Sequence, residues 1–129
     1  MSENTSKSAI SHILFQFSER GPFSPSFHGA TELIGKRWNG AIIYSLFHGL
    51  TRFSELKGAI PGLSARMLSE RLKELEANGL VKRMVMPETP VRVEYHLSEK
   101  GLALRDVLIA IDRWAQQWHT IEPTNKQSE

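Results

Sequence analysis

Residues 61–81 read PGLSARMLSERLKELEANGLV, the most informative segment of the chain for its fold. The Pro-Gly pair at its start stops any preceding helix, because proline lacks an amide hydrogen and glycine favours turns. Ser64 can cap a new helix, since its hydroxyl can accept a hydrogen bond from an amide of the first turn. Gly79 can end that helix in a left-handed conformation. The pattern therefore predicts a tight turn followed by a helix over residues 64–78.

This predicted helix has an apolar side and a polar side. Leu68, Leu72 and Leu75 fall together on a helical wheel, as residues that face a core do. The opposite side mixes hydrogen-bond donors and acceptors, which suits base edges and phosphates. On an arbitrary amphipathic helix such a polar side is more often merely solvated. Whether this helix binds DNA must therefore be judged from the elements beside it. If the helix reads DNA, its DNA-binding residues are predicted to be Ser64, Ala65, Arg66, Ser69, Glu70 and Lys73.

The flanking segments complete a winged helix-turn-helix pattern. Residues 51–60 have apolar side chains at helical spacing and predict the helix before the turn. Residues 91–97 alternate apolar and polar side chains, as a half-buried strand does, and residues 80–86 supply a partner strand. We therefore predict a mainly α fold with a small β-wing over residues 80–98, which reaches the DNA backbone or minor groove beside the recognition helix.

Of three arginines near this unit, one is predicted to pair within the protein and two to contact DNA. Arg71 lies at the edge of the leucine side, so we expect it to pair with Glu55 or Glu74 rather than with DNA. Arg52, near the start of the 51–60 helix, and Arg92, near the tip of the wing, are predicted to contact phosphate. Isolated basic residues are more often only solubilising, and that alternative stays open for Arg52.

Helical spacing also predicts helices outside this unit. They cover residues 6–18, 27–34, 36–48 and 99–119. The last of these has apolar residues on two faces, and a single small domain cannot cover both, so we predict a homodimer built by the terminal helices. The predicted dimerisation residues are Ile10, Ile13, Leu14, Phe17, Leu104, Val107, Leu108, Ile111, Trp114 and Trp118.

Length and composition favour one intracellular domain. The chain has 129 residues, of which 40% are hydrophobic. We expect an arm helix and linker over residues 1–24, a winged helix-turn-helix domain with the C-terminal dimerisation helix over 25–119, and a flexible tail over 120–129. We find no leader and no apolar run that approaches the roughly 20 residues of a membrane span, so we predict a cytoplasmic protein without membrane contact.

Charge is concentrated in the middle of the chain. The net charge is only +2, but residues 35–105 contain twelve Lys and Arg against seven Asp and Glu. Cysteine is absent, which excludes disulfides, thiolate metal sites and a cysteine nucleophile. The five histidines are never three or four residues apart, and no catalytic motif is recognisable. We therefore predict no metal, no cofactor and no enzymatic activity.

Two alternatives remain open on this reasoning. A winged helix can serve as a protein–protein interaction module without DNA binding. In addition, a pocket for a small apolar effector is conceivable, although aromatic residues at helical spacing are more often simply core. The aromatic residues considered for such a pocket are Trp38, Trp114, Trp118, Phe23, Phe27, Phe47 and Tyr44.

Several stretches of the chain resemble the HxlR family of winged-helix, MarR-like regulators. They are residues 33–38 (LIGKRW), 52–56 (RFSEL), 61–81 quoted above, and 87–101 (PETPVRVEYHLSEKG). The resemblance covers about residues 30–118.

The resemblance implies a transcriptional repressor that binds a pseudo-palindromic operator in double-stranded DNA as a homodimer. It also implies regulation of genes that handle reactive or toxic compounds. Several members sense electrophiles or oxidants through a cysteine ahead of the first conserved helix. Here residues 25–28 (PSFH) occupy that region, so thiol sensing is excluded for this chain and its signal is not identified.

Overall fold

The computed structural model describes residues 24–121, and the predicted arm with Ile10, Ile13, Leu14 and Phe17 lies outside them. The chain divides into two units after Lys36. In the first, helix α2 (Pro25–Gly35) begins because Ser24 caps it, with its hydroxyl oxygen 3.3 Å from the amide nitrogen of Phe27.

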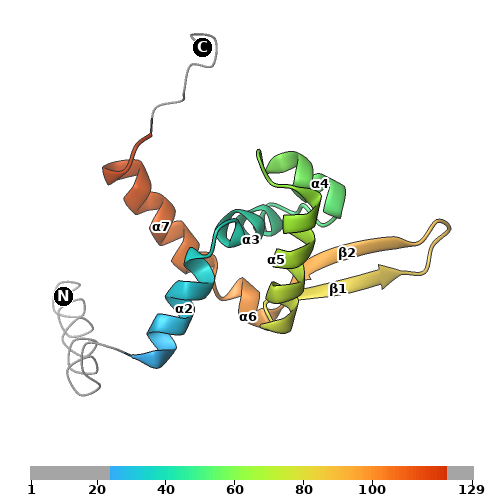
Figure 1. Cartoon of the computed structure of the whole chain (residues 1–129), viewed down its shortest axis with the longest axis horizontal. Helices are drawn as coiled ribbons and strands as arrows, with labels where there is room; N and C mark the ends of the chain where they lie inside the picture. Colours follow the sequence, from blue (N-terminus) through green and yellow to red (C-terminus); the bar gives the residue numbers. More distant parts are fainter. Residues whose placement is uncertain (1–23, 122–129) are drawn as a thin grey trace, which may run out of the picture. The chain divides into compact units, whose positions relative to one another are not determined.

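The second unit is a winged helix-turn-helix domain. Its elements are α3 (Asn39–Phe47), α4 (Phe53–Ala59), α5 (Ala65–Ala77), β1 (Val81–Met86), β2 (Arg92–Leu97), α6 (Glu99–Leu102) and α7 (Arg105–Trp118). The strands form an antiparallel ribbon that pairs Val81 with Leu97 at its base and Met86 with Arg92 at its tip. Figure 1 shows this ribbon projecting beside α5. The predicted mainly α fold with a small β-wing is confirmed.

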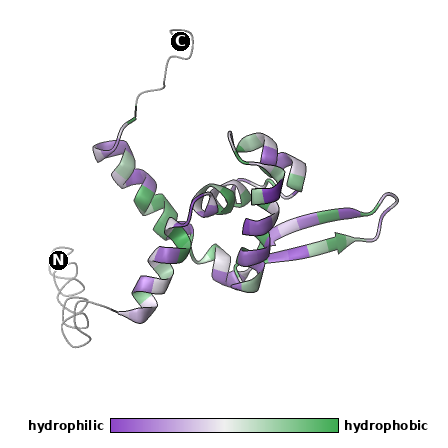
Figure 2. Cartoon of the chain, in the orientation of Figure 1, coloured by the Kyte–Doolittle hydropathy of each residue, from purple (hydrophilic) through white to green (hydrophobic). Residues whose placement is uncertain are grey.

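The core of this domain lies among α3, α4, α5 and the base of the wing. Helix α3 is largely hydrophobic, as its colour in Figure 2 shows. Each apolar side chain removed from water stabilises the fold by roughly 1.5–3 kcal/mol. The fully buried apolar side chains, all at most 2% exposed, are Ile42, Ile43, Leu56, Leu68, Leu72, Leu75, Leu80 and Val81.

The turn before α5 and both ends of α5 follow the sequence prediction. Gly62 has a φ of +83° and Gly79 a φ of +75°, a region that glycine enters without strain. The hydroxyl of Ser64 accepts a hydrogen bond from the amide of Met67 at 3.1 Å. The helix over residues 64–78 was therefore predicted with its correct boundaries and cap.

Two predicted helices differ from the observed ones. The helix predicted from residue 36 begins at Asn39, because Trp38 adopts a φ of 79°, which interrupts a right-handed helix. The single helix predicted over residues 99–119 is two helices, α6 and α7. Between them the chain makes a turn of the 3₁₀ type, in which the amide of Leu104 donates to the carbonyl of Gly101, three residues earlier, at 3.1 Å.

The alternating burial predicted for the second strand is also wrong. All six residues of β2 are half-buried, and Val91 lies before the strand and is 64% exposed. The polar side of β2 is partly covered because Arg92, Glu94 and His96 pair with one another on it.

Candidate nucleic-acid interface

The polar side of α5 is exposed along its length. The side chain of Arg66 is 90% exposed, and its Nε lies 3.3 Å from Oε1 of Glu70, one turn further on. Lys73 is also exposed, whereas Ser69 is half-buried. Figure 2 shows hydrophilic and hydrophobic residues interleaved along α5. A single surface ion pair holds its partners weakly, so the Arg66 guanidinium remains available to an external anion.

The amino end of α5 is exposed too. Ser64 and Ala65 both lie at the surface. The hydroxyl oxygen of Ser64 accepts the capping hydrogen bond, and its O–H group can still donate one.

Arg71 faces the protein, as expected. Its side chain is 12% exposed, and its Nη1 lies 3.6 Å from Oε2 of Glu74. Its Nε also donates to the carbonyl of Arg37 at 3.0 Å, which the sequence did not indicate. Arg71 thus ties α5 to the segment before α3.

The base of the wing is fastened to the end of α5. The hydroxyl of Ser98 donates to the carbonyl of Gly79 and accepts from the amide of Gly101 at 3.1 Å. Lys100 Nζ donates to the carbonyl of Asn78 at 2.8 Å. These bonds satisfy carbonyls that a helix end leaves without partners, and they fix the direction of the wing relative to α5.

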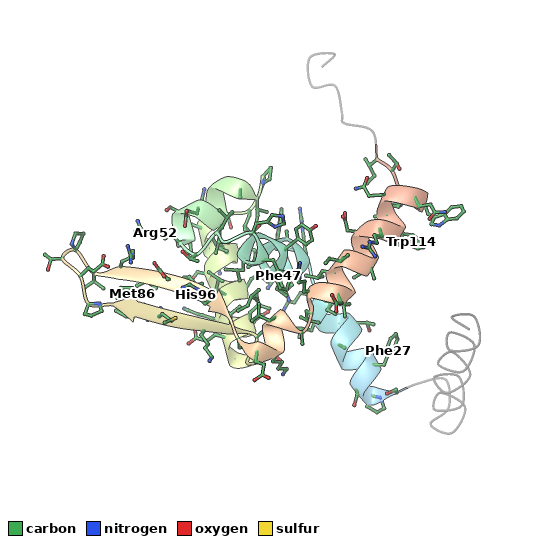
Figure 3. All side chains as sticks on the ribbon, turned by 180° about the vertical axis from the view of Figure 1, so that it is seen from behind. Phe27, Phe47, Arg52, Met86, His96 and Trp114 are labelled. Carbon is green, nitrogen blue, oxygen red and sulfur yellow. The ribbon has the colours of Figure 1, made fainter. Side chains whose placement is uncertain are left out.

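The middle of the wing is fastened to the start of α4. The amide of Tyr95 donates to the carbonyl of Thr51 at 2.7 Å. The amide of Arg52 in turn donates to Glu55 Oε1 at 2.9 Å, which closes the first turn of α4. Arg52 therefore lies beside the ribbon, and it lines a groove of about 550 Å³ together with residues 88–93. Figure 3 labels Arg52 and, on β2, His96.

Arg92 is held by two carboxylates at the tip of the wing. Its Nη2 lies 3.1 Å from Oε1 of Glu88, and its Nε lies 3.0 Å from Oε2 of Glu94. His96 Nε2 donates to Oε1 of Glu94 at 2.8 Å. The hydrogen bond from His96 lowers the pKa of Glu94; burial opposes this shift, and the positive charges of Arg92 and Arg52 add to it.

The sequence prediction included Arg92 but missed Glu88, Glu94 and His96. A signal was present, since residues 92, 94 and 96 fall on one side of a strand and alternate in charge.

Residues 33–123 match the model of the HxlR-like helix-turn-helix family. The chain belongs to this family. It is 52% identical over 100 residues to the HTH-type transcriptional regulator YvaP of Bacillus subtilis, covering 78% of this chain and 91% of YvaP. It is 52% identical over 94 residues to the HTH-type transcriptional regulator YodB of the same organism, covering 73% of this chain and 84% of YodB.

The structure of reduced YodB superimposes with a TM-score of 0.70 at 48% identity, covering 78% of this chain and 99% of that one. These relatives are transcriptional regulators and not enzymes. This HxlR-like chain is accordingly a transcriptional regulator, a function that implies DNA binding.

Helix α7 of this HxlR-like regulator has an exposed apolar side. Val107 is 42% exposed, Ile111 48%, Trp114 59% and Trp118 68%. Leu108 instead is 7% exposed and belongs to the core of the domain, and Leu104 is half-buried just before the helix. The structure therefore divides the predicted dimerisation residues of this helix between two surfaces. Trp114 is labelled in Figure 3.

An apolar groove of about 460 Å³ runs between α3, the end of α4 and α7. Tyr44, Ile60, Ile111 and Ala115 are among the residues that line it. Of the aromatic residues considered from the sequence, Trp38 lies against Gly62, and Trp114 and Trp118 are exposed on α7. Phe23 lies outside the described residues, and Phe27 belongs to the other unit. Tyr44 is the one of these aromatic residues that lines the groove within the described part of the second unit.

Within residues 24–121, no helix is long and apolar enough to span a membrane.

Proposed function

We propose that the protein is a repressor that binds a pseudo-palindromic operator in double-stranded DNA as a homodimer. Helix α5 enters the major groove, and the wing contacts the flanking backbone or minor groove. One observation supports this most directly. The leucines of α5 are at most 1% exposed while Arg66, on the opposite side, is 90% exposed.

The chemistry of α5 fits base edges and phosphates. Arg66 can donate two hydrogen bonds to guanine, and Glu70 can accept from cytosine. Lys73 suits a phosphate, and Ser64 and Ala65 lie at the end of the helix that enters a groove first. Ser69 is half-buried and lies at the margin of this surface.

The wing adds basic groups away from α5. Arg92 lies at its tip, and Arg52 lies beside it at the start of α4. Because the wing base is bonded to α5 and the wing middle to α4, these groups have fixed positions relative to the recognition helix. Phosphate contacts of this kind position a protein on the duplex without reading its sequence.

A homodimer explains the exposed side of α7. Isolated proteins rarely leave a row of large apolar residues in water, and such a row indicates an interaction surface. The proposed interface comprises Val107, Ile111, Trp114 and Trp118, with the predicted Ile10, Ile13, Leu14 and Phe17 of the arm. A twofold axis there would place two copies of α5 in successive major grooves, about 34 Å apart.

An apolar effector would fit the groove between α3 and α7. A ligand there would alter DNA affinity if it bound two arrangements of the dimer with different affinities. YodB has been crystallised in a reduced form, after diamide treatment and with a quinone bound. This chain has no cysteine, so an effector would have to act without a thiol.

Selection from a pool of random-sequence duplexes tests the proposed function. We expect the pure protein to enrich one two-part sequence, with affinity that falls steeply as salt rises from about 50 to 200 mM because condensed counterions are released. If no sequence is enriched and the affinity for DNA does not change with salt concentration, the alternative of a protein–protein interaction module would be favoured.

A further inference from the structure

The two carboxylates that hold Arg92 differ in their surroundings. The side chain of Glu94 is 15% exposed, and it also accepts a hydrogen bond from His96 at 2.8 Å. The side chain of Glu88 is 52% exposed and lies in the turn that joins the strands. The Glu94 side chain is therefore fixed on β2. Glu88 instead forms a solvent-exposed ion pair with Arg92, and such pairs contribute little stability.

The two carboxylates also meet different nitrogens of the guanidinium. Glu94 pairs with Nε, an atom that is buried, and this contact is an ion pair rather than an aligned hydrogen bond. Glu88 pairs with Nη2, at the outer end of the side chain. An external phosphate oxygen would reach Nη2 by taking the place of the Glu88 carboxylate, and it would leave Glu94 where it is.

We propose that Glu94 positions Arg92 for a DNA phosphate and that Glu88 competes with that phosphate for the same guanidinium. This inference rests on the proposed DNA binding of the wing. In the free protein Glu88 occupies the outer nitrogen of Arg92. On binding, phosphate replaces it, and Glu88 is released to water.

The two roles predict opposite effects of removing negative charge. Glu88→Gln strengthens binding about twofold to fivefold, the size of an exposed ion pair. Glu94→Ala weakens binding about tenfold, because a charged partner that orients Arg92 is lost. Simple long-range electrostatics predicts tighter binding for both, since each change removes a negative charge. The sign for Glu94 therefore separates positioning from charge alone.

The experiment measures affinity by fluorescence anisotropy on the duplex that selection yields. Wild type, Glu88→Gln, Glu94→Ala and Glu94→Gln are compared, each also in an Arg92→Gln background. Glu99→Gln on α6 is the matched control, since it makes the same charge change at an exposed position of another element. Without Arg92, we expect both glutamate effects to fall to the small charge effect of Glu99→Gln, which itself does not depend on Arg92. Circular dichroism and thermal melting verify the fold of each variant.

Each result decides the inference. Three results would overturn it while the proposed function stands: unchanged affinity for Glu88→Gln, tighter binding by Glu94→Ala, or glutamate effects that keep their full size in the Arg92→Gln background. If Glu94→Ala does not fold, Glu94→Gln must bind more weakly than wild type or the inference is wrong. If wild type binds no duplex, the proposed function fails first, and the roles of both glutamates fail with it.

Discussion

Gly101 of α6 lies directly against the carbonyl oxygen of Leu80, in the segment that connects α5 to the wing. A Cβ at residue 101 would overlap that oxygen and approach a side-chain carbon of Leu97 at 3.0 Å. Because the obstacle is backbone, it cannot swing aside as a flexible side chain would. The close approach lets Ser98 and Lys100 reach the end of α5.

Gly101→Ala should therefore destabilise the protein by about 2 kcal/mol or more, as forced overpacking does. Urea unfolding followed by circular dichroism measures this. Gly58→Ala is the matched control, since a Cβ there meets nothing within 4 Å. Alanine favours a helix over glycine by up to about 1 kcal/mol, so the control should be neutral or more stable. Equal stability of the two variants would show that the contact is unimportant.

Glu94 should make stability depend on pH in the acid range. Its pKa is lowered in the folded protein, so its charged form contributes stability that is fully present above its ordinary value of 4.5. That contribution is lost as pH falls through the lower folded pKa. Urea unfolding across this range should show wild type losing more stability than Glu94→Gln as the pH drops. Parallel curves for the two proteins would mean that Glu94 makes no such contribution.

Trp114 should hold the proposed dimer together. It is 59% exposed on α7, and Trp114→Glu would place a charge in the apolar contact. A central aromatic residue commonly contributes about 2 kcal/mol or more to an interface, so the dissociation constant should rise at least about thirtyfold. Light scattering over a dilution series measures the mass. Gln116→Glu, at an exposed polar position of the same helix, should leave it unchanged. A monomeric wild type at micromolar concentration would contradict the dimer.

Helix α5 could be predicted because its signals are local. The cap at Ser64, the left-handed Gly79 and the leucine spacing all lie within or beside the helix itself. The Arg71–Glu74 pair was also foreseeable, since residues three apart on a helix are neighbours.

Other features depend on contacts between distant segments and could not be predicted in this way. The apolar pattern of residues 99–119 continues through the break between α6 and α7, which lies just after the close contact of Gly101 with Leu80. The same pattern does not predict that Leu108 faces the core of its own domain while Trp114 is exposed. A helical wheel shows which residues share a side of the helix, but not which other elements cover that side.

The proposed function depends on duplex DNA binding to the outward side of α5. This is best measured by a mobility-shift titration of wild type, Arg66→Ala and Lys73→Ala on the selected duplex, with circular dichroism confirming an intact fold. We predict that Arg66→Ala binds about tenfold or more weakly and loses discrimination at one base pair. Lys73→Ala should weaken binding to all sequences and reduce the salt slope by about one. Unchanged binding by both folded variants would contradict the account.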